Sequence, residues 1–82
     1  MVLVDIEVPS LSRKYHFMLD EDIDVELLIT EIVTIIEQRE QCKLDGRREN
    51  IVLYLRSSGV MLMKNECLKI QKVKNGDVLI MV

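Results

Sequence analysis

The chain opens with two stretches in which apolar and polar side chains alternate. Over residues 2–8, the valines and the isoleucine share one face, and Leu3 lies on the other face with two acids. Residues 14–19 alternate in the same way, with aromatic and leucine side chains on one face. A period of two is typical of a half-buried strand. We therefore predict two strands that form a hairpin, joined by a loop at residues 9–13.

The period changes to that of a helix after Asp24. Apolar residues recur every three or four positions from Val25 to Ile36 and fall on one face. Asp24 is a suitable N-cap, and the acids around it suit the positive end of the helix dipole. We predict a helix from about Val25 to Gln41, whose opposite face is polar except for Leu27.

The second half of the chain contains shorter elements separated by turn residues. We predict a loop at residues 43–50 around Asp45-Gly46, a strand at 51–56, a turn at 57–59 and a short edge strand at 60–63. Because Arg56 should remain solvated, the residues in phase with it, Val52 and Tyr54, are assigned to the outer face of the sheet.

The chain ends in an uninterrupted apolar run. Residues 67–73 predict an irregular stretch or a single turn, anchored by Leu68 and Val73. The Asn-Gly pair at 75–76 predicts a tight turn with positive φ, and residues 78–82 are all apolar. A strand without alternation is usually central. We therefore predict an α+β fold in which the last strand lies beside the first, in a mixed sheet of four to five strands with one helix across one face.

Length and composition favour a folded domain. The chain has 82 residues, of which 49% are hydrophobic and 30% charged. This balance is typical of a globular protein, and the length suits a single domain over residues 1–82. No apolar run approaches the roughly 18 residues that a membrane span needs, and charges come too early for a secretory signal. We expect a cytoplasmic protein with no direct membrane insertion.

The net charge of -3 conceals an asymmetry between the two halves. Residues 1–41 carry about ten acids and three bases, whereas residues 42–82 carry about four acids and eight bases. The basic stretch with Lys69, Lys72 and Lys74 could steer a charged partner, or it could simply be solvated. The bases are dispersed, and two tyrosines and one phenylalanine are the only aromatics. This pattern argues against nucleic-acid binding.

Residues that carry chemistry are few. Cys42 and Cys67 are too far apart for a zinc knuckle or a redox pair. His16 lacks spaced partners for a metal, and no third group is evident to orient it beside a cysteine nucleophile. The isolated glycines form no phosphate cradle. We therefore expect a protein that is not an enzyme and binds no cofactor or metal.

The pattern resembles the ubiquitin-like superfamily over essentially the whole chain. The resemblance rests on the helix capped by Asp24, on the anchoring positions taken by Leu68 and Val73, and on the terminal strand. Within that superfamily, the chain is similar to the small YukD (EsaB) family of Gram-positive bacteria. That likeness is carried by Glu66-Cys67-Leu68 and by Val73-Lys74-Asn75-Gly76-Asp77 leading into the last strand.

The resemblance implies a ubiquitin-like β-grasp fold and a function. Members of the YukD family are stand-alone ubiquitin-like proteins associated with type VII (WXG100) secretion, and a related domain forms the cytosolic N-terminus of a membrane subunit of that apparatus. We therefore expect a non-catalytic adaptor or regulator that binds proteins such as an FtsK-like ATPase or membrane components. The alternative is a general ubiquitin-like interaction or dimerisation module, or the soluble domain of a larger protein, unrelated to secretion; a homodimer is compatible with either.

Ubiquitin-like modifiers and sulfur carriers are activated at a flexible tail that ends in Gly-Gly. This sequence ends Ile80-Met81-Val82, within the predicted last strand. We expect a chain that is not conjugated, as in the YukD family. A sulfur carrier or modifier with a trimmed tail is a third alternative.

The remaining candidate site is a surface. The resemblance places Leu79 and Met81 inward, which the apolar run itself does not decide. The predicted partner-binding residues on the outer sheet face are Leu3, Val52, Tyr54, Val78 and Ile80. A contiguous exposed apolar patch of this kind usually marks an interaction site. The alternatives are that charged neighbours such as Asp5, Lys14 and Arg56 shield scattered apolar atoms, or that the inward and outward faces of the last strand are the reverse of this assignment.

Overall fold

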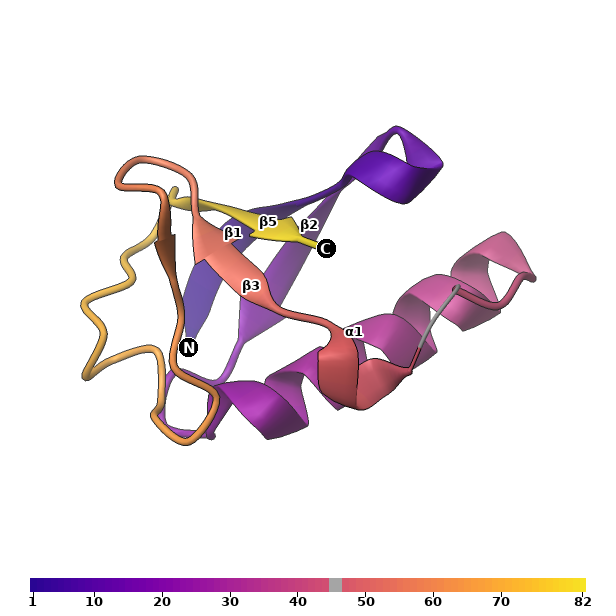
Figure 1. The fold of residues 1–82 in the computed structure, drawn as a ribbon. Coiled ribbons are helices and arrows are strands. Elements are labelled where there is room, and N and C mark those ends of the chain that lie inside the picture. Colours follow the sequence, from indigo (N-terminus) through magenta and orange to yellow (C-terminus); the bar gives the residue numbers. More distant parts are fainter. Residues whose placement is uncertain (45–46) are drawn as a thin grey trace.

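The computed structural model describes residues 1–44 and 47–82 (Figure 1). The elements are β1 (Val2–Val8), β2 (Arg13–Leu19), α1 (Val25–Glu40), β3 (Leu53–Leu55), β4 (Val60–Met61) and β5 (Val78–Met81), with single 3-10 turns at Pro9–Leu11 and Arg48–Asn50. The loop predicted around Asp45-Gly46 lies outside the described residues at those two positions. The order of the other elements is as predicted.

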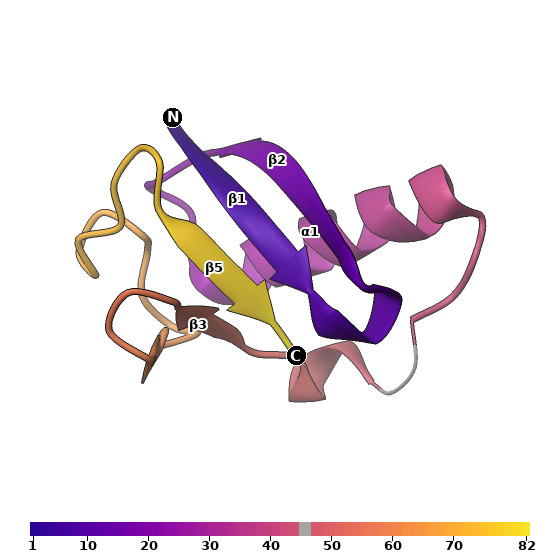
Figure 2. The same cartoon turned by 90° about the horizontal axis from the view of Figure 1, so that it is seen from above.

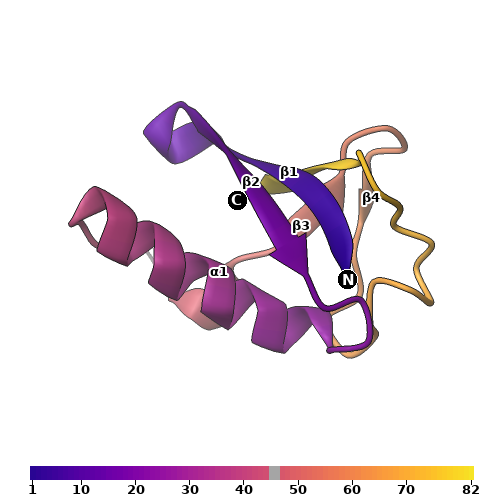
Figure 3. The same ribbon diagram turned by 180° about the vertical axis from the view of Figure 1, so that it is seen from behind.

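The strands form one five-stranded mixed sheet in the order β2-β1-β5-β3-β4. β5 pairs in parallel with β1 and antiparallel with β3, so the last strand is central, as its apolar run predicted (Figure 2). The other two pairs, β1 with β2 and β3 with β4, are antiparallel. The helix α1 covers a single face of this sheet (Figure 3).

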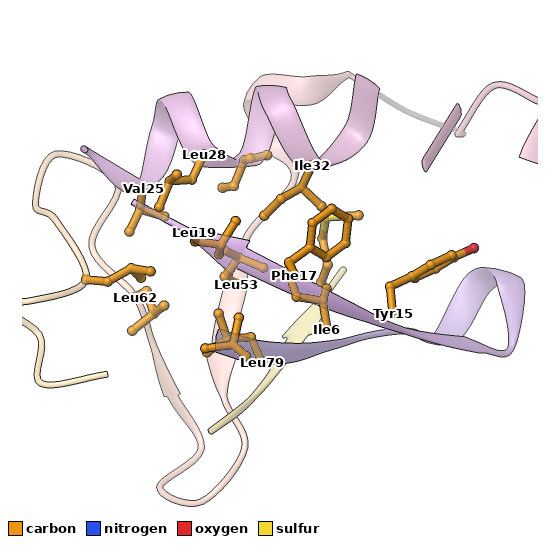
Figure 4. Packing of buried hydrophobic residues seen from close by; sticks show 14 of the residues in the cluster. Ile6, Tyr15, Phe17, Leu19, Val25, Leu28, Ile32, Leu53, Leu62 and Leu79 are labelled. Atoms are coloured by element: carbon orange, nitrogen blue, oxygen red, sulfur yellow. The ribbon is translucent and has the colours of Figure 1, made fainter. Parts of the chain in front are cut away.

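The hydrophobic core lies between α1 and the inner face of the sheet. Ile6, Leu53 and Leu79 from three adjacent strands are completely buried, and Leu28 and Ile32 of α1 point toward the sheet side chains (Figure 4). Burying an aliphatic side chain of this size contributes about 1.5–3 kcal/mol. The alternation of residues 2–8 is confirmed, because every second side chain in β1 is buried.

The start of α1 differs from its prediction in one respect. Asp24 is the N-cap residue, but its side chain makes no capping hydrogen bond. The first helical N–H groups are satisfied instead by backbone carbonyls from a distant segment: Val25 donates to Glu66 at 3.0 Å and Glu26 donates to Lys64 at 3.0 Å. Free helical N–H groups need partners, and here the chain after β4 supplies them.

The predicted edge strand at residues 60–63 is shorter in the structure, where β4 ends at Met61. Beyond the end of β4, the side chain of Gln71 pairs with the backbone of Met63. Its Oε1 accepts the N–H of Met63 at 2.6 Å, and its Nε2 donates to the Met63 carbonyl at 2.9 Å. An amide side chain thus replaces a neighbouring strand at this point.

The turn before β5 joins that strand to β1. Gly76 has a φ of +88°, the left-handed conformation that favours glycine, as the Asn-Gly pair predicted. The N–H of Gly76 donates to the Leu3 carbonyl at 2.8 Å, and Asn75 Oδ1 accepts the N–H of Leu3 at 2.8 Å. These bonds fix the register between the first and last strands.

Candidate protein-interaction surface

The sheet face opposite α1 carries the predicted partner-binding residues. Leu79 and Met81 are buried in the core, which turns Val78 and Ile80 to the outer face. Ile80 is paired with Tyr54 of β3, and Tyr54 is paired in turn with Met61 of β4. Paired residues share a face. We define the outer patch as Tyr54, Met61, Val78 and Ile80.

The five predicted residues differ in exposure and in their neighbours on the sheet. Tyr54, Val78 and Ile80 lie together and are half-buried. Val52 lies at one end of this group, where its N–H donates to the Val82 carbonyl at 2.8 Å. Leu3 lies in β1, is 47% exposed and is paired with Met18 of the edge strand β2.

Charged side chains cover part of the outer patch. Arg56 follows β3 and Glu7 belongs to β1, yet Arg56 Nη1 lies 2.6 Å from Glu7 Oε1. Because β5 lies between those strands, the ion pair crosses it beside Val78 and Ile80. The side chain of Asp5 contacts His16 Nδ1 on the same face. The Arg56–Glu7 pair therefore lies over part of the patch, whereas the side chain of Asp5 is directed toward β2.

Sequence reasoning missed an exposed apolar group beside the open edge of β4. Met61, Met63 and Ile70 are 51%, 57% and 65% exposed, and with Val60 they line a hollow of about 440 Å³. Methionine side chains adapt to varied partner surfaces because they are flexible and polarisable. The sequence contained an indication of this group, because the two residues that flank the buried Leu62 are methionines, where polar residues would be usual at exposed positions.

The candidate catalytic residues lie apart. Cys67 forms an isolated backbone β-bridge with Asp24 at the start of α1, whereas Cys42 follows the end of that helix. A helix of 16 residues separates them by about 24 Å. His16 lies on the outer face of β2, 77% exposed. Among residues 1–44 and 47–82, no three His, Cys, Asp or Glu side chains are grouped to hold a metal ion.

The one helix described is neither long nor apolar enough for a transmembrane segment, and no other candidate span occurs in the described residues.

No protein-family model matches this sequence, and no curated protein matches it by sequence. Solved structures match it well. The EccD5 ubiquitin-like domain from Mycobacterium xenopi has a TM-score of 0.80 at 22% identity, covering 99% of this chain and 91% of that one. Ubiquitin from Caldiarchaeum subterraneum has a TM-score of 0.73 at 14% identity, covering 98% of this chain and 89% of that one. The chain has the ubiquitin-like β-grasp fold.

A third match comes from the structure of a membrane assembly. A chain of the MycP5-free ESX-5 inner membrane complex in State II has a TM-score of 0.80 at 20% identity. The match covers 99% of this ubiquitin-like chain and 20% of that one. At these identities, the likeness establishes the shared fold.

Proposed function

We propose that this chain is a non-catalytic adaptor or regulatory component of a type VII (WXG100-type) secretion system. It acts by protein-protein interaction in the cytoplasm and is not conjugated through its C-terminus. The observation that carries the proposal is the TM-score of 0.80 with the EccD5 ubiquitin-like domain over 99% of this chain. The match to a chain of the ESX-5 inner membrane complex and the sequence resemblance to the YukD family support the same role.

The partner surface in this proposal is the outer patch. Tyr54 lies at its centre between Ile80 and Met61. Tyrosine is enriched among the residues that dominate binding energy, because its ring buries a large area and its hydroxyl can hydrogen-bond. A partner that displaces the Arg56–Glu7 ion pair would gain access to Val78 and Ile80, and exposed ion pairs cost little to rearrange.

The test is affinity capture of the tagged protein from detergent-solubilised cells of its native host, followed by mass spectrometry. We expect recovery of an FtsK-like secretion ATPase or of membrane components of the same system. The double variant Tyr54→Asp with Ile80→Asp should lose these proteins while keeping its circular dichroism spectrum.

Leu27→Asp is the matched control, because Leu27 is 60% exposed on the helix, away from the outer patch. Its capture profile should equal that of the unmodified chain. Recovery of no secretion component would contradict the proposed function. Equal recovery by the double variant would contradict the assignment of the surface.

A further inference from the structure

β2 is an open edge of the sheet. It is seven residues long, stands at one end of the strand order and pairs only with β1 among the described strands (Figure 2). An unpaired edge presents backbone donors and acceptors that can pair with another strand. The opposite edge, β4, is only two residues long. β2 is therefore the sheet edge with room for strand pairing.

The register identifies the free backbone groups. Asp5 donates its N–H to Asp77 at 3.0 Å, so Leu3 and Asp5 direct their backbone groups toward β5. By alternation, the neighbouring β1 residues bond to Tyr15, Phe17 and the residues in phase with them in β2. The N–H and C=O groups that point away from β1 belong to Lys14, His16 and Met18. No turn, loop or side-chain hydrogen bond of the described residues engages them.

The charges at the two ends of β2 are of opposite sign, so that two antiparallel copies of this strand would be complementary in charge. Arg13 and Lys14 begin β2, whereas Asp20 and Glu21 follow its end. Two antiparallel copies of β2 related by a two-fold axis at Phe17 would place Lys14 opposite Asp20. Arg13 and Glu21 have partners within each copy, since Arg13 lies 3.6 Å from Glu40 and Glu21 lies 3.3 Å from the N-terminal amine. Opposite charges on facing positions stabilise an antiparallel pair.

The same register satisfies the free backbone groups. With the axis at Phe17, His16 of one copy faces Met18 of the other, and both residues have their N–H and C=O groups on the open side. A register centred on His16 would also pair the backbone groups, but it would place Lys14 opposite Met18 and separate Lys14 from Asp20. The charge pattern therefore selects the axis at Phe17.

We propose that β2 pairs antiparallel with β2 of a second copy of this chain, centred on Phe17, so that one sheet continues through both copies. Met18 is 60% exposed and Leu3, its neighbour in β1, is 47% exposed. Near the axis these apolar side chains would become partly covered. The inference does not depend on the secretion role, because it uses a different strand from the outer patch.

The first test measures amide hydrogen exchange by NMR over a range of protein concentrations up to about 1 mM, together with sedimentation equilibrium. We expect a dimer in which the Lys14, His16 and Met18 amides become protected as the concentration rises. The Met61 amide, at the opposite edge, serves as the internal control and should not change. A chain that remains monomeric at about 1 mM would overturn the proposal.

Variants test the surface. Met18→Pro removes a donor that points away from β1, so it should abolish the dimer and leave the β1–β2 ladder intact. Met18→Ala is the control for loss of the side chain and should still dimerise. Lys14→Glu places like charges opposite each other twice and should weaken the dimer about tenfold. A folded Met18→Pro chain that dimerises as well as the unmodified chain would overturn the proposal.

Disulfide trapping tests the register, in a background where Cys42 and Cys67 are replaced by serine. A mixture of His16→Cys and Met18→Cys chains should form a mixed disulfide, because facing residues are within bridging distance. Neither variant alone should cross-link. Cross-linking of His16→Cys alone would place the axis at His16 and contradict the proposed register.

Discussion

Arg56 and Glu7 are 49 positions apart in the chain, yet their side chains meet at 2.6 Å across the central strand β5. Both residues lie on the outer face, with side chains 58% and 27% exposed. The ion pair thus lies over the apolar side of β5, beside Ile80. The central strand is apolar on both faces, although only one face contacts the helix. The ion pair between the two flanking strands partly covers the other face.

Removal of this pair should change binding more than stability. Arg56→Ala should alter the free energy of unfolding by less than about 1 kcal/mol, because partly exposed ion pairs contribute little. It should also expose Val78 and Ile80 and strengthen partner capture. Urea unfolding and the capture assay measure the two effects, with Glu7→Gln as the companion variant. A stability loss well above this bound would mean that Arg56 acts mainly through packing.

Truncation of a core side chain should strongly reduce the free energy of unfolding. Leu79 is completely buried between β1 and β3, so Leu79→Ala should reduce the free energy of unfolding by about 2–5 kcal/mol. Val60→Ala at the exposed edge is the control and should change it by about 0.5 kcal/mol or less. Equal effects in urea unfolding would contradict the assignment of Leu79 to the core.

Acid should weaken the contact between α1 and the following loop. The pKa of Glu37 is lowered from its ordinary value of 4.5, chiefly because its carboxylate accepts the N–H of Leu44 and also pairs with Arg48. A lowered pKa in the folded state stabilises the fold above the ordinary pKa, and this stabilisation is lost as the pH falls through the folded-state pKa. We expect melting temperatures measured downward from pH 7 to show a smaller acid-induced loss in Glu37→Gln. An unchanged acid profile in that variant would contradict the assignment.

Alkaline pH should reduce the stability of the fold through the ionisation of Tyr15. Burial raises the pKa of its hydroxyl above 10.0, and the hydrogen bond to Glu40 at 3.0 Å acts in the same direction. A raised pKa means that the unfolded chain ionises first, so this stabilisation is complete below about 10 and is lost as the pH rises through the folded-state pKa. Ultraviolet titration of Tyr54→Phe, which leaves Tyr15 as the only tyrosine, should report a raised midpoint. A midpoint at the ordinary value would show that Tyr15 is solvated.

The order and phase of the elements follow from local patterns. The alternation in residues 2–8 and the helical spacing after Asp24 each record which face of an element is buried, and burial is the dominant stabilising term. The continuous apolar run at 78–82 predicted a central strand, but not which side chains face the core. That choice came from the ubiquitin-like resemblance, and the buried positions of Leu79 and Met81 agree with it.

The strands, the helix and the turn at Gly76 could be predicted from local sequence, because each depends on neighbours within a few residues. The contacts between distant groups became visible only in the assembled fold. Leu3 lies opposite Met18, the start of the helix receives the carbonyls of residues 64 and 66, and Arg56 meets Glu7. These contacts depend on strand order and register, which are set by packing the whole core at once.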